Sequence, residues 1–408
     1  MFFKTSSKSK IVGKNVVVVG SMNCMPTEYS IVLAELGANV IHYYDAEPND
    51  SLSNPLLRYP TITKVKNLSL KKLKCRHTMH FIASRLLHSS ITDELKSADI
   101  VILSGPAISL ARFLKRNRVV IAIGYGDDIS AFCNPEWPFF NFKRRSLFQR
   151  IMFGWILFLL QKYFVCLQRR GLSSSTIYSY FIPGLDIRTD LILSNLIRSN
   201  KPTRVSRYSI STKNVPELKD SLVKKIDARL KVIFPVRFSS SSVMFADKGW
   251  RNFINYASSY IEAKKKDLEA VAFICFNKGD QVDEAKIALK ALSIDRYFHW
   301  FDVVPFHDLY SMMNDSDVVV DQLGDQWVGV GLWGGLLGKP VICNLSTKAK
   351  RDMFRDSYFL HASNREQFCD HLSQCESLEF VNGAKKINPL VVNERFSIEK
   401  EIDQWLNL

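Results

Sequence analysis

A glycine-rich stretch at residues 316–343 has the residue types of an anion-binding turn. It reads SDVVVDQLGDQWVGVGLWGGLLGKPVIC, so an apolar strand at 317–321 runs into glycines and a short helix at 331–337. Gly338-Lys339-Pro340 then leads into a second strand at 341–343. Glycine lets the backbone approach a ligand closely, and a helix N-terminus presents free N–H groups to an anion. The stretch alone predicts a nucleotide-like ligand in an α/β fold.

Two basic residues upstream are candidates to meet the charge of such a ligand. Arg237 follows an apolar strand at 231–236, and Lys248 stands just before a helix that begins at Trp250. Arginine can hold two phosphate oxygens in a fork, while lysine acts as a compact point charge. The alternative for Arg237 is an ordinary surface ion pair. Its place after an apolar strand, beside a serine-rich loop, favours a site, whereas Lys248 alone is uninformative.

The elements that must position these residues alternate along the chain in two series. The first series has predicted strands at 16–19, 39–44, 99–103, 119–123 and 190–193, with helices at 27–36 and 107–115. A polar, basic segment at 198–214 is the predicted linker. The second series has strands at 231–236, 270–276, 297–301 and 317–321, helices at 250–264, 282–292 and 308–313, and a final amphipathic helix at 398–406.

This alternation predicts parallel sheets with helices on both faces. The expected fold class is therefore α/β, with two doubly wound Rossmann-like domains facing across a cleft. We expect an N-terminal domain at 1–205 and a C-terminal domain at 206–385. Residues 386–408 would form a C-terminal helix that packs back on the first domain.

The charge of the chain lies almost entirely in its first half. The 408 residues carry a net charge of +15, and 47% of them are hydrophobic, which suits two domains with sizeable cores. Residues 1–210 hold 29 Lys and Arg against 13 Asp and Glu, a net +16, whereas residues 211–408 hold 26 against 27, a net −1. The excess indicates a solvated basic face, or a surface for an anionic membrane, an acidic substrate or nucleic acid. No nucleic-acid-binding motif is recognisable, so nucleic acid is not an expected partner.

Residues 139–170 favour the membrane among these partners. They read FFNFKRRSLFQRIMFGWILFLLQKYFVCLQRR, and the uninterrupted apolar run at 151–160 is ten residues, too short to span a bilayer. Basic residues flank this run on both sides: Lys143, Arg144, Arg145, Arg150, Arg169 and Arg170. Aromatic and aliphatic side chains between basic ends suit the headgroup boundary of an anionic leaflet. The alternative is a buried helix that links domain elements.

Cysteines and histidines point to neither disulfides nor metal. The eight cysteines form no CxxC pair, which suits reduced thiols in a cytosolic protein, and the N-terminus lacks an apolar core of signal-peptide length. None of the eight histidines has a ligand partner at the usual spacing, so no metal and no cofactor are expected. A dehydrogenase is disfavoured because GSMNCMP, not GxGxxG, follows the strand at 16–19.

The second half resembles the donor domain of GT-B fold glycosyltransferases, in particular glycosyltransferase family 4. The ordered motifs that carry the resemblance are Phe234-Pro235-Val236-Arg237, Asp247-Lys248-Gly249-Trp250, residues 304–310 (VPFHDLY), residues 316–322 and Gly338-Lys339-Pro340-Val341-Ile342. They cover about 110 residues. The first half matches more loosely, through its strand–helix start and residues 121–129 (IAIGYGDDI).

The resemblance implies that a nucleotide-sugar donor binds in the second domain. Negative charge grows on the diphosphate as it leaves, and fixed cations that meet it lower the barrier. Arg237 and Lys248 match the diphosphate-binding positions, and Asp321, Gln322, Asp325 and Gly329 are the candidates for the nucleotide and sugar.

One position departs from the family pattern. Trp333 stands near a glutamate that usually holds the ribose, so Asp321 or Asp325 would replace that glutamate, the donor pose would differ, or transfer activity would be lost. Asp321, at a strand end, has a second interpretation as a structural cap.

The acceptor is expected at the carboxyl ends of the strands in the first domain. The cleft loops would be formed by Gly20, Ser21 and Met22, after the first strand, and by Gly124 and Gly126. Asp127 or Asp128 would accept the proton of the acceptor hydroxyl or orient it. The alternative for Asp128 is a helix N-cap.

Together these observations predict a cytoplasmic glycosyltransferase, of hexosyltransferase type, at the inner face of the membrane. It would move a sugar from a nucleotide-sugar donor to a lipid-linked or polysaccharide acceptor in the assembly of a capsule, lipopolysaccharide or exopolysaccharide. The resemblance implies retention of the anomeric configuration. Two alternatives stay open: a sugar-nucleotide epimerase of the same fold, and a non-catalytic membrane-docked binding protein, for which Trp333 is the main support.

Overall fold

The computed structural model divides the chain into two compact units, each built on one parallel sheet. It describes residues 10–21, 24–46, 48, 53–73, 89–114, 119–124, 132–136, 138, 154–180, 191–195, 204–207, 209–239, 248–267, 269–324 and 328–406. Among these, unit 1 holds the residues up to Ser211 together with those from Ile398 onward, and unit 2 holds Thr212–Ser397. The boundaries predicted from the sequence are 205/206 and 385/386.

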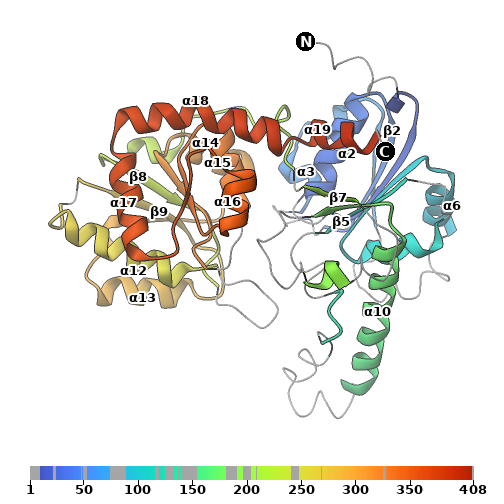
Figure 1. Cartoon of the computed structure of the whole chain (residues 1–408), viewed down its shortest axis with the longest axis horizontal. Coiled ribbons are helices and arrows are strands. Elements are labelled where there is room, and N and C mark those ends of the chain that lie inside the picture. Colours follow the sequence, from blue (N-terminus) through green and yellow to red (C-terminus); the bar gives the residue numbers. More distant parts are fainter. Residues whose placement is uncertain are drawn as a thin grey trace. The chain divides into compact units, whose positions relative to one another are not determined.

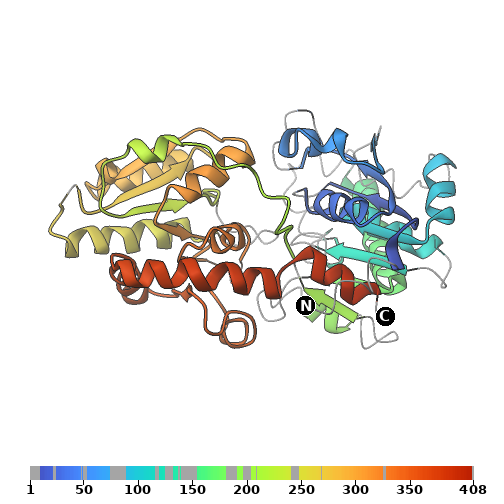
Figure 2. The same cartoon turned by 90° about the horizontal axis from the view of Figure 1, so that it is seen from above.

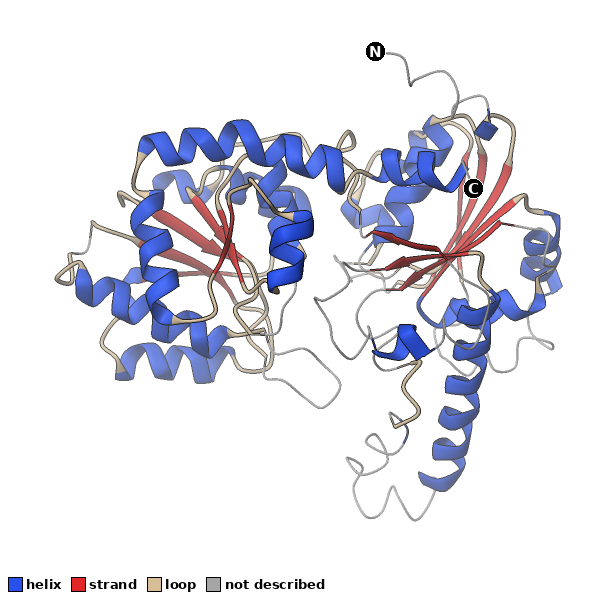
Figure 3. Cartoon of the chain, in the orientation of Figure 1, coloured by secondary structure: helices blue, strands red, loops and turns tan. Residues whose placement is uncertain are grey.

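Unit 1 contains a sheet in the order β3-β2-β1-β4-β5-β6-β7, with every neighbouring pair parallel (Figures 1 and 3). Its strands are β1 Asn15–Val19, β2 Asn39–Tyr44, β3 Leu68–Lys72, β4 Ile100–Ser104, β5 Val119–Gly124, β6 Ile177–Tyr180 and β7 Arg204–Arg207. Its helices are α2 Met25–Glu35, α3 Pro55–Arg58, η2 Ile62–Lys64, α6 Ser89–Ser97, η3 Gly105–Phe113, α10 Trp155–Ser174 and α19 Ile398–Leu406. The apolar runs of β1 and β4 are buried, as central parallel strands are.

Three local predictions for this unit are wrong. The predicted strand at 190–193 is helical at 191–195, because a short apolar run has no periodicity that separates strand from helix. The linker predicted at 198–214 is wrong where Arg204–Arg207 (RVSR) forms the edge strand β7, although the boundary between the units, at 211/212, lies within the predicted range. The helix predicted at 107–115 is the 3₁₀ segment η3, which begins at Gly105 with Pro106 in its first turn.

The last helix, α19, completes unit 1 by packing on α2. Trp405 stacks on Tyr29 with 5.1 Å between ring centroids, and Ile398 and Ile402 are fully buried. Glu401 lies in this apolar contact, where Ser179 Oγ donates a hydrogen bond to its Oε1 at 2.7 Å and the Tyr29 hydroxyl donates to its Oε2. A buried carboxylate is tolerated here because two hydroxyls hold it.

Unit 2 contains a six-stranded parallel sheet in the order β10-β9-β8-β11-β12-β13. Its strands are β8 Lys231–Phe234, β9 Ala272–Phe276, β10 Phe298–Phe301, β11 Val318–Val320, β12 Val341–Cys343 and β13 Phe359–His361. Its helices are η5 Leu222–Lys225, α12 Trp250–Ala263, α13 Val282–Ala291, η6 Asp295–Tyr297, α14 Phe306–Asn314, α15 Val330–Leu336, α16 Thr347–Met353, α17 Arg365–Cys375 and α18 Leu378–Arg395. Helices cover both faces of the sheet, with α18 running along one side (Figures 2 and 3).

An aromatic core fixes α12 against the centre of this sheet. Phe253 of α12 stacks on Phe234 of β8 at 4.1 Å between centroids and meets Phe273 of β9 edge-on at 5.6 Å. The strands and helices predicted for this half between 231 and 343 are confirmed within a few residues at each end. The elements from α16 to α18 have no counterpart in the prediction.

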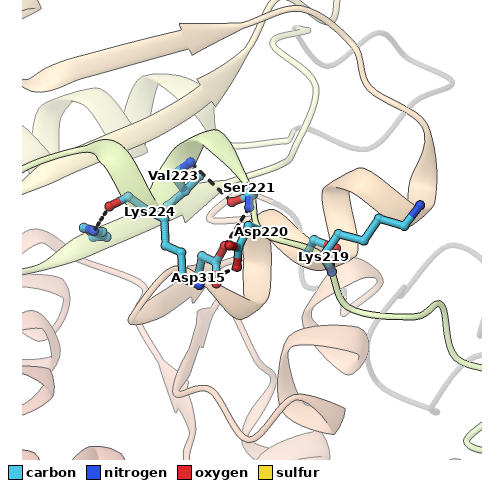
Figure 4. Close-up of polar contacts among 8 residues, drawn as sticks. Lys219, Asp220, Ser221, Val223, Lys224 and Asp315 are labelled. Atoms are coloured by element: carbon cyan, nitrogen blue, oxygen red, sulfur yellow. Dashed lines mark hydrogen bonds and ion pairs between the residues drawn. The ribbon is translucent and has the colours of Figure 1, made fainter.

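The first segment of unit 2 is tied to the C-terminal end of α14 (Figure 4). The Ser221 N–H donates to Asp315 Oδ2 at 3.0 Å, and the Lys219 N–H donates to Ser311 Oγ at 3.1 Å. At the start of β8, the Lys231 N–H donates to Asp317 Oδ2 at 2.7 Å. These hydrogen bonds hold the amino ends of β8 and β11 in place.

We expect Glu401→Ala to lower the free energy of unfolding of unit 1 by about 2–4 kcal/mol, because the hydroxyls of Tyr29 and Ser179 lose their buried acceptor. Urea unfolding followed by circular dichroism measures the loss. The control is Gln404→Ala on the exposed side of the same helix, which should cost no more than about 0.5 kcal/mol. Equal effects of the two changes would contradict a stabilising role for Glu401.

Candidate functional site

The candidate site of unit 2 lies where the strand order changes direction. From β8 the chain continues to β9 and β10 on one side, and then returns to place β11 on the other side of β8. In open parallel sheets, ligands bind beyond the carboxyl ends of the two strands at such a point. Arg237 follows β8, and Asp321 and Gln322 follow β11 directly, so these predicted site residues come from neighbouring strand ends.

Arg237 is an exposed side chain on a tightly fixed backbone. Its neighbours Val236 and Phe238 are buried. The Phe238 N–H donates to the Lys278 carbonyl at 2.7 Å, and its carbonyl accepts from the Gln281 N–H at 3.0 Å. Within the described part of the chain, no ion pair engages the guanidinium of Arg237. The surface-ion-pair alternative therefore finds no partner there.

Lys248 is brought to the same strand end by a close backbone contact. Gly249 has a left-handed φ of +71°, and a Cβ at this position would lie 2.0 Å from the Gly324 nitrogen. The N-terminus of α12 therefore packs directly against the turn after β11, and Lys248 Nζ donates to Gln322 Oε1 at 3.1 Å. The sequence predicted both residues as donor-binding but not their contact.

Asp321 makes the contacts of a structural cap. The residue is 1% exposed, and its carboxylate accepts from three N–H groups: Gln322 at 2.9 Å, Gly329 at 2.7 Å and Gly331 at 2.8 Å. Burial raises the pKa of Asp321, while the three N–H groups and the charge of Lys248 oppose the shift. Of the two interpretations open from the sequence, these contacts are those of the cap.

This cap corrects the prediction that the helix N-terminus in the glycine-rich stretch is free for an anion. The N–H groups of Gly329 and Gly331, at the start of α15, already donate to the Asp321 carboxylate. A Cβ at Gly331 would lie 2.8 Å from a Val341 methyl and 3.0 Å from Asp321 Oδ2, so this glycine serves internal packing. Arg237, after β8, and Lys248, which donates to Gln322 after β11, remain the candidate cations for an anion at this edge.

Trp333 is a core residue of unit 2. Its side chain is 3% exposed and meets Phe306 and Tyr310 of α14 edge-on, with centroid separations of 5.0 and 6.0 Å. Gly334 and Gly335, the next two residues, allow α15 to approach the sheet, since a Cβ at either would lie within 3 Å of Val319 or Phe359. The indole therefore stabilises the α14–α15 contact.

Sequence reasoning missed two asparagines that hold the turn after β11. Asn252 Nδ2 donates to the Leu323 carbonyl at 2.9 Å, and Asn344 Nδ2 donates to the Gly324 carbonyl at 2.5 Å. The Asn344 N–H also donates to the Gln322 carbonyl at 2.9 Å. The available signal was the place of Asn344 directly after the strand at 341–343, at the same edge of the sheet as Gln322.

Unit 1 has an equivalent change of strand order between β1 and β4. Gly20 follows β1 with φ of +115°, and a Cβ there would lie 2.7 Å from the Ser104 carbonyl oxygen. His42 Nε2 lies 2.8 Å from the Gly20 carbonyl, and Ser21 Oγ donates to Asp45 Oδ1 at 2.5 Å. The predicted residues Gly20 and Ser21 therefore line the carboxyl edge, and Gly124 ends β5 at the same edge.

The remaining predicted site residues, Met22, Gly126, Asp127, Asp128 and Asp325, lie outside the described residues. Among the residues that are described, no cluster of three or more His, Cys, Asp or Glu could hold a metal ion. The same part of the chain contains no helix long and apolar enough to cross a membrane.

Comparison with solved structures defines the fold. A glycosyltransferase of Rickettsia africae matches at a TM-score of 0.58 and 13% identity, over 97% of both chains. HepE of Anabaena, in complex with UDP and glucose, matches at 0.60 and 10% identity, over 96% of this chain and 98% of its own. Sucrose-phosphate synthase of Thermosynechococcus elongatus matches at a TM-score of 0.61 and 10% identity, over 96% of this chain and 97% of its own. No protein-family model and no curated protein sequence matches the chain.

The chain therefore has the GT-B fold, an α/β fold of two doubly wound Rossmann-like units. The fold class predicted from the sequence is confirmed, and so is the resemblance to GT-B proteins at the level of the fold. At sequence identities of 10–13%, this structural similarity establishes the fold and no other property of the chain.

We expect Trp333→Glu to lower the free energy of unfolding of unit 2 by about 4 kcal/mol or more, because it removes a packed indole and buries a carboxylate. Trp333→Phe, the matched control, keeps an aromatic ring and should cost about 1–2 kcal/mol. Chemical denaturation measures both. A Trp333→Glu protein of wild-type stability would contradict the assignment of Trp333 to the core of unit 2.

His42 gives unit 1 a defined pH dependence. Burial lowers its pKa from 6.5 to about 4, partly opposed by the hydrogen bond to the Gly20 carbonyl. Between these values the unfolded chain binds a proton that the folded protein does not, so stability falls as pH decreases, by at most about 1.4 kcal/mol per pH unit. Denaturation of wild type and His42→Gln from pH 7 to 4.5 should show this slope in the wild type only. If the free energy of unfolding depended on pH in the same way in both proteins, the lowered pKa of His42 would be contradicted.

Proposed function

We propose that the protein is a glycosyltransferase that takes its sugar from a nucleotide-sugar donor bound in unit 2. The observation that supports this most directly is the pair of cations at the change of strand order, Arg237 exposed after β8 and Lys248 held by Gln322 after β11. Solved structures of the same fold include HepE with UDP and glucose bound. A diphosphate ligand matches the positive charge that these residues place at this edge.

In the proposed reaction, Arg237 and Lys248 stabilise the diphosphate leaving group. As the glycosidic bond to the donor phosphate breaks, charge accumulates on the diphosphate, and Arg237 and Lys248 would neutralise it. The fixed backbone at Phe238, next to Arg237, and the turn held at Leu323 and Gly324 lower the reorganisation needed during the reaction. In this scheme the two side-chain cations neutralise the leaving diphosphate, and the reaction uses no metal and no cofactor.

The acceptor side of the proposal rests on unit 1. We propose that Asp127 or Asp128, beyond β5, accepts or orients the proton of the acceptor hydroxyl, and that the sugar, a hexose, is transferred with retention by same-face attack. The positive charge of the first half of the chain suits an acceptor that is itself anionic or carried on an anionic surface. A lipid-linked glycan or polysaccharide at the cytoplasmic face of a membrane, in surface glycan assembly, fits this charge.

The first test is thermal stabilisation by UDP, GDP, ADP and CMP. We expect one nucleoside diphosphate, at about 100 times its Kd, to raise Tm by about 5 °C or more. Arg237→Ala should raise the Kd of that nucleoside diphosphate by about 10- to 100-fold, because a charge-assisted contact to phosphate is lost. A chelator in the same titration should leave the shift unchanged.

The control variant is Arg296→Ala, which removes an equal, exposed charge just before β10, at the opposite edge of the same sheet. It should bind the nucleotide as the wild type does. The proposal fails if no nucleotide raises Tm, or if the two variants behave alike. A nucleotide that binds without transfer to any acceptor would favour the binding-protein alternative, and isomerisation of the free nucleotide sugar would favour an epimerase.

A further inference from the structure

Helix α10 of unit 1 exposes an apolar stripe along its solvent side. Trp155 is 64% exposed and Leu159 is 63% exposed, and Ile156 and Tyr163 are also exposed. Residues four apart share one face of a helix, so Trp155, Leu159 and Tyr163 form a continuous row. Lys162, Cys166 and Arg170 are exposed on this same face. We call these seven residues the α10 stripe.

The opposite side of α10 is anchored to unit 1 in its C-terminal half. Phe164, Leu167 and Leu172 are buried there. A Cβ at Gly171 would lie 2.1 Å from the Ile108 carbonyl oxygen, so the helix backbone packs directly on η3. The N-terminal half, with most of the apolar part of the stripe, extends away from the sheet of unit 1 (Figure 1). The exposed apolar side chains are therefore carried on a firmly held helix.

The charge around the stripe defines its partner. Between Glu136 and Asp186 the sequence contains no acidic residue and seven basic ones. Two of the seven, Lys162 and Arg170, lie on the stripe itself, and the ammonium of Lys162 lies 4.8 Å from the centroid of Phe158. Tryptophan and tyrosine prefer the boundary between water and lipid, and each basic residue near an anionic leaflet contributes about 1 kcal/mol to binding.

We propose that the α10 stripe docks on an anionic phospholipid bilayer, with its aromatic rings at the level of the headgroups. The helix lies on the surface, since no described helix is long and apolar enough to cross a bilayer and α10 carries Lys162, Arg169 and Arg170. This deepens the proposed function, on which it rests for its biological purpose, by naming the surface that brings the protein to a lipid-borne acceptor.

The same helix connects the stripe to the carboxyl edge of the sheet of unit 1. Gln168, one turn before Gly171 and fully buried, donates from Nε2 to the Gly105 carbonyl at 2.8 Å. Gly105 follows β4, at the change of strand order where Gly20 meets Ser104. Docking of α10 therefore holds this edge at a fixed distance from the lipid headgroups.

The test is co-flotation of the full chain with phosphatidylcholine vesicles, with and without phosphatidylglycerol, at low and high salt. We expect binding only when phosphatidylglycerol is present, and weaker binding at high salt. The double change Trp155→Ala/Leu159→Glu should reduce vesicle binding about tenfold or more. Lys162→Glu/Arg170→Glu should reduce vesicle binding about fivefold or more per charge and weaken its salt dependence, since five basic residues of the stretch remain.

The matched control carries Ile287→Glu and Leu378→Glu, which alter two equally exposed apolar residues of unit 2. It should bind vesicles as the wild type does, and all variants should keep the wild-type Tm because the changed side chains are exposed. The inference is overturned if the wild type ignores anionic vesicles, or if the control and the stripe variants bind alike. It is also overturned if the stripe variants only convert a dimer to a monomer in light scattering, because the occupant would then be a second copy.

Nucleotide stabilisation measured on the same samples separates this inference from the proposed function. Stripe variants that lose vesicle binding should retain the full shift in Tm with the nucleoside diphosphate, since that site lies in unit 2. Loss of vesicle binding with an intact nucleotide shift supports the inference. Wild-type vesicle binding without any nucleotide shift would support docking and remove the donor-site proposal.

Discussion

The geometry of the site in unit 2 depends on the burial of one carboxylate. Asp321 lies at the end of β11 with 1% of its surface exposed, and a buried charge of this kind is stable only when every oxygen is satisfied. Three backbone N–H groups meet it, from Gln322, Gly329 and Gly331. These bonds fix both ends of the turn between β11 and α15. They also engage the N–H groups of Gly329 and Gly331 at the start of α15, so the side chains of Arg237 and Lys248 are the proposed source of positive charge for a phosphate.

Close backbone contacts then determine where those side chains stand. Gly249 allows the start of α12 to touch the turn at Gly324, which brings Lys248 to Gln322. Asn252 and Asn344 hold the carbonyls of the same turn, so its shape is set from two sides. In unit 1, Gly20 touches Ser104 in the corresponding way and His42 holds its carbonyl. Both sheets thus use a glycine contact at the point where the strand order changes direction.

The electrostatic difference between the two halves suggests a division of labour. The first half carries +16 and the second −1, while the exposed apolar side chains of α10 lie within the acid-free stretch of the first half. A net charge does not specify a fold, but it governs which surfaces a protein approaches. In the proposal developed here, unit 1 meets the membrane and acceptor, and unit 2 needs only a local pair of cations for the donor.

The sequence by itself determined the α/β class, the parallel strands and most helices of residues 231–343, because apolar strands and amphipathic helices have different periods. It also placed Arg237 and Gln322 at strand ends, since position after a strand is a local property. It could not separate helix from strand at 191–195, where the apolar run is too short, nor detect β7, in which three of the four residues are polar. Only the tertiary structure decided that Asp321 caps α15, that Trp333 fills the contact with α14, and that Lys248 reaches Gln322. Each of these depends on residues distant in the chain, and a carboxylate or an indole has the same local pattern whether it meets a ligand or the protein's own interior.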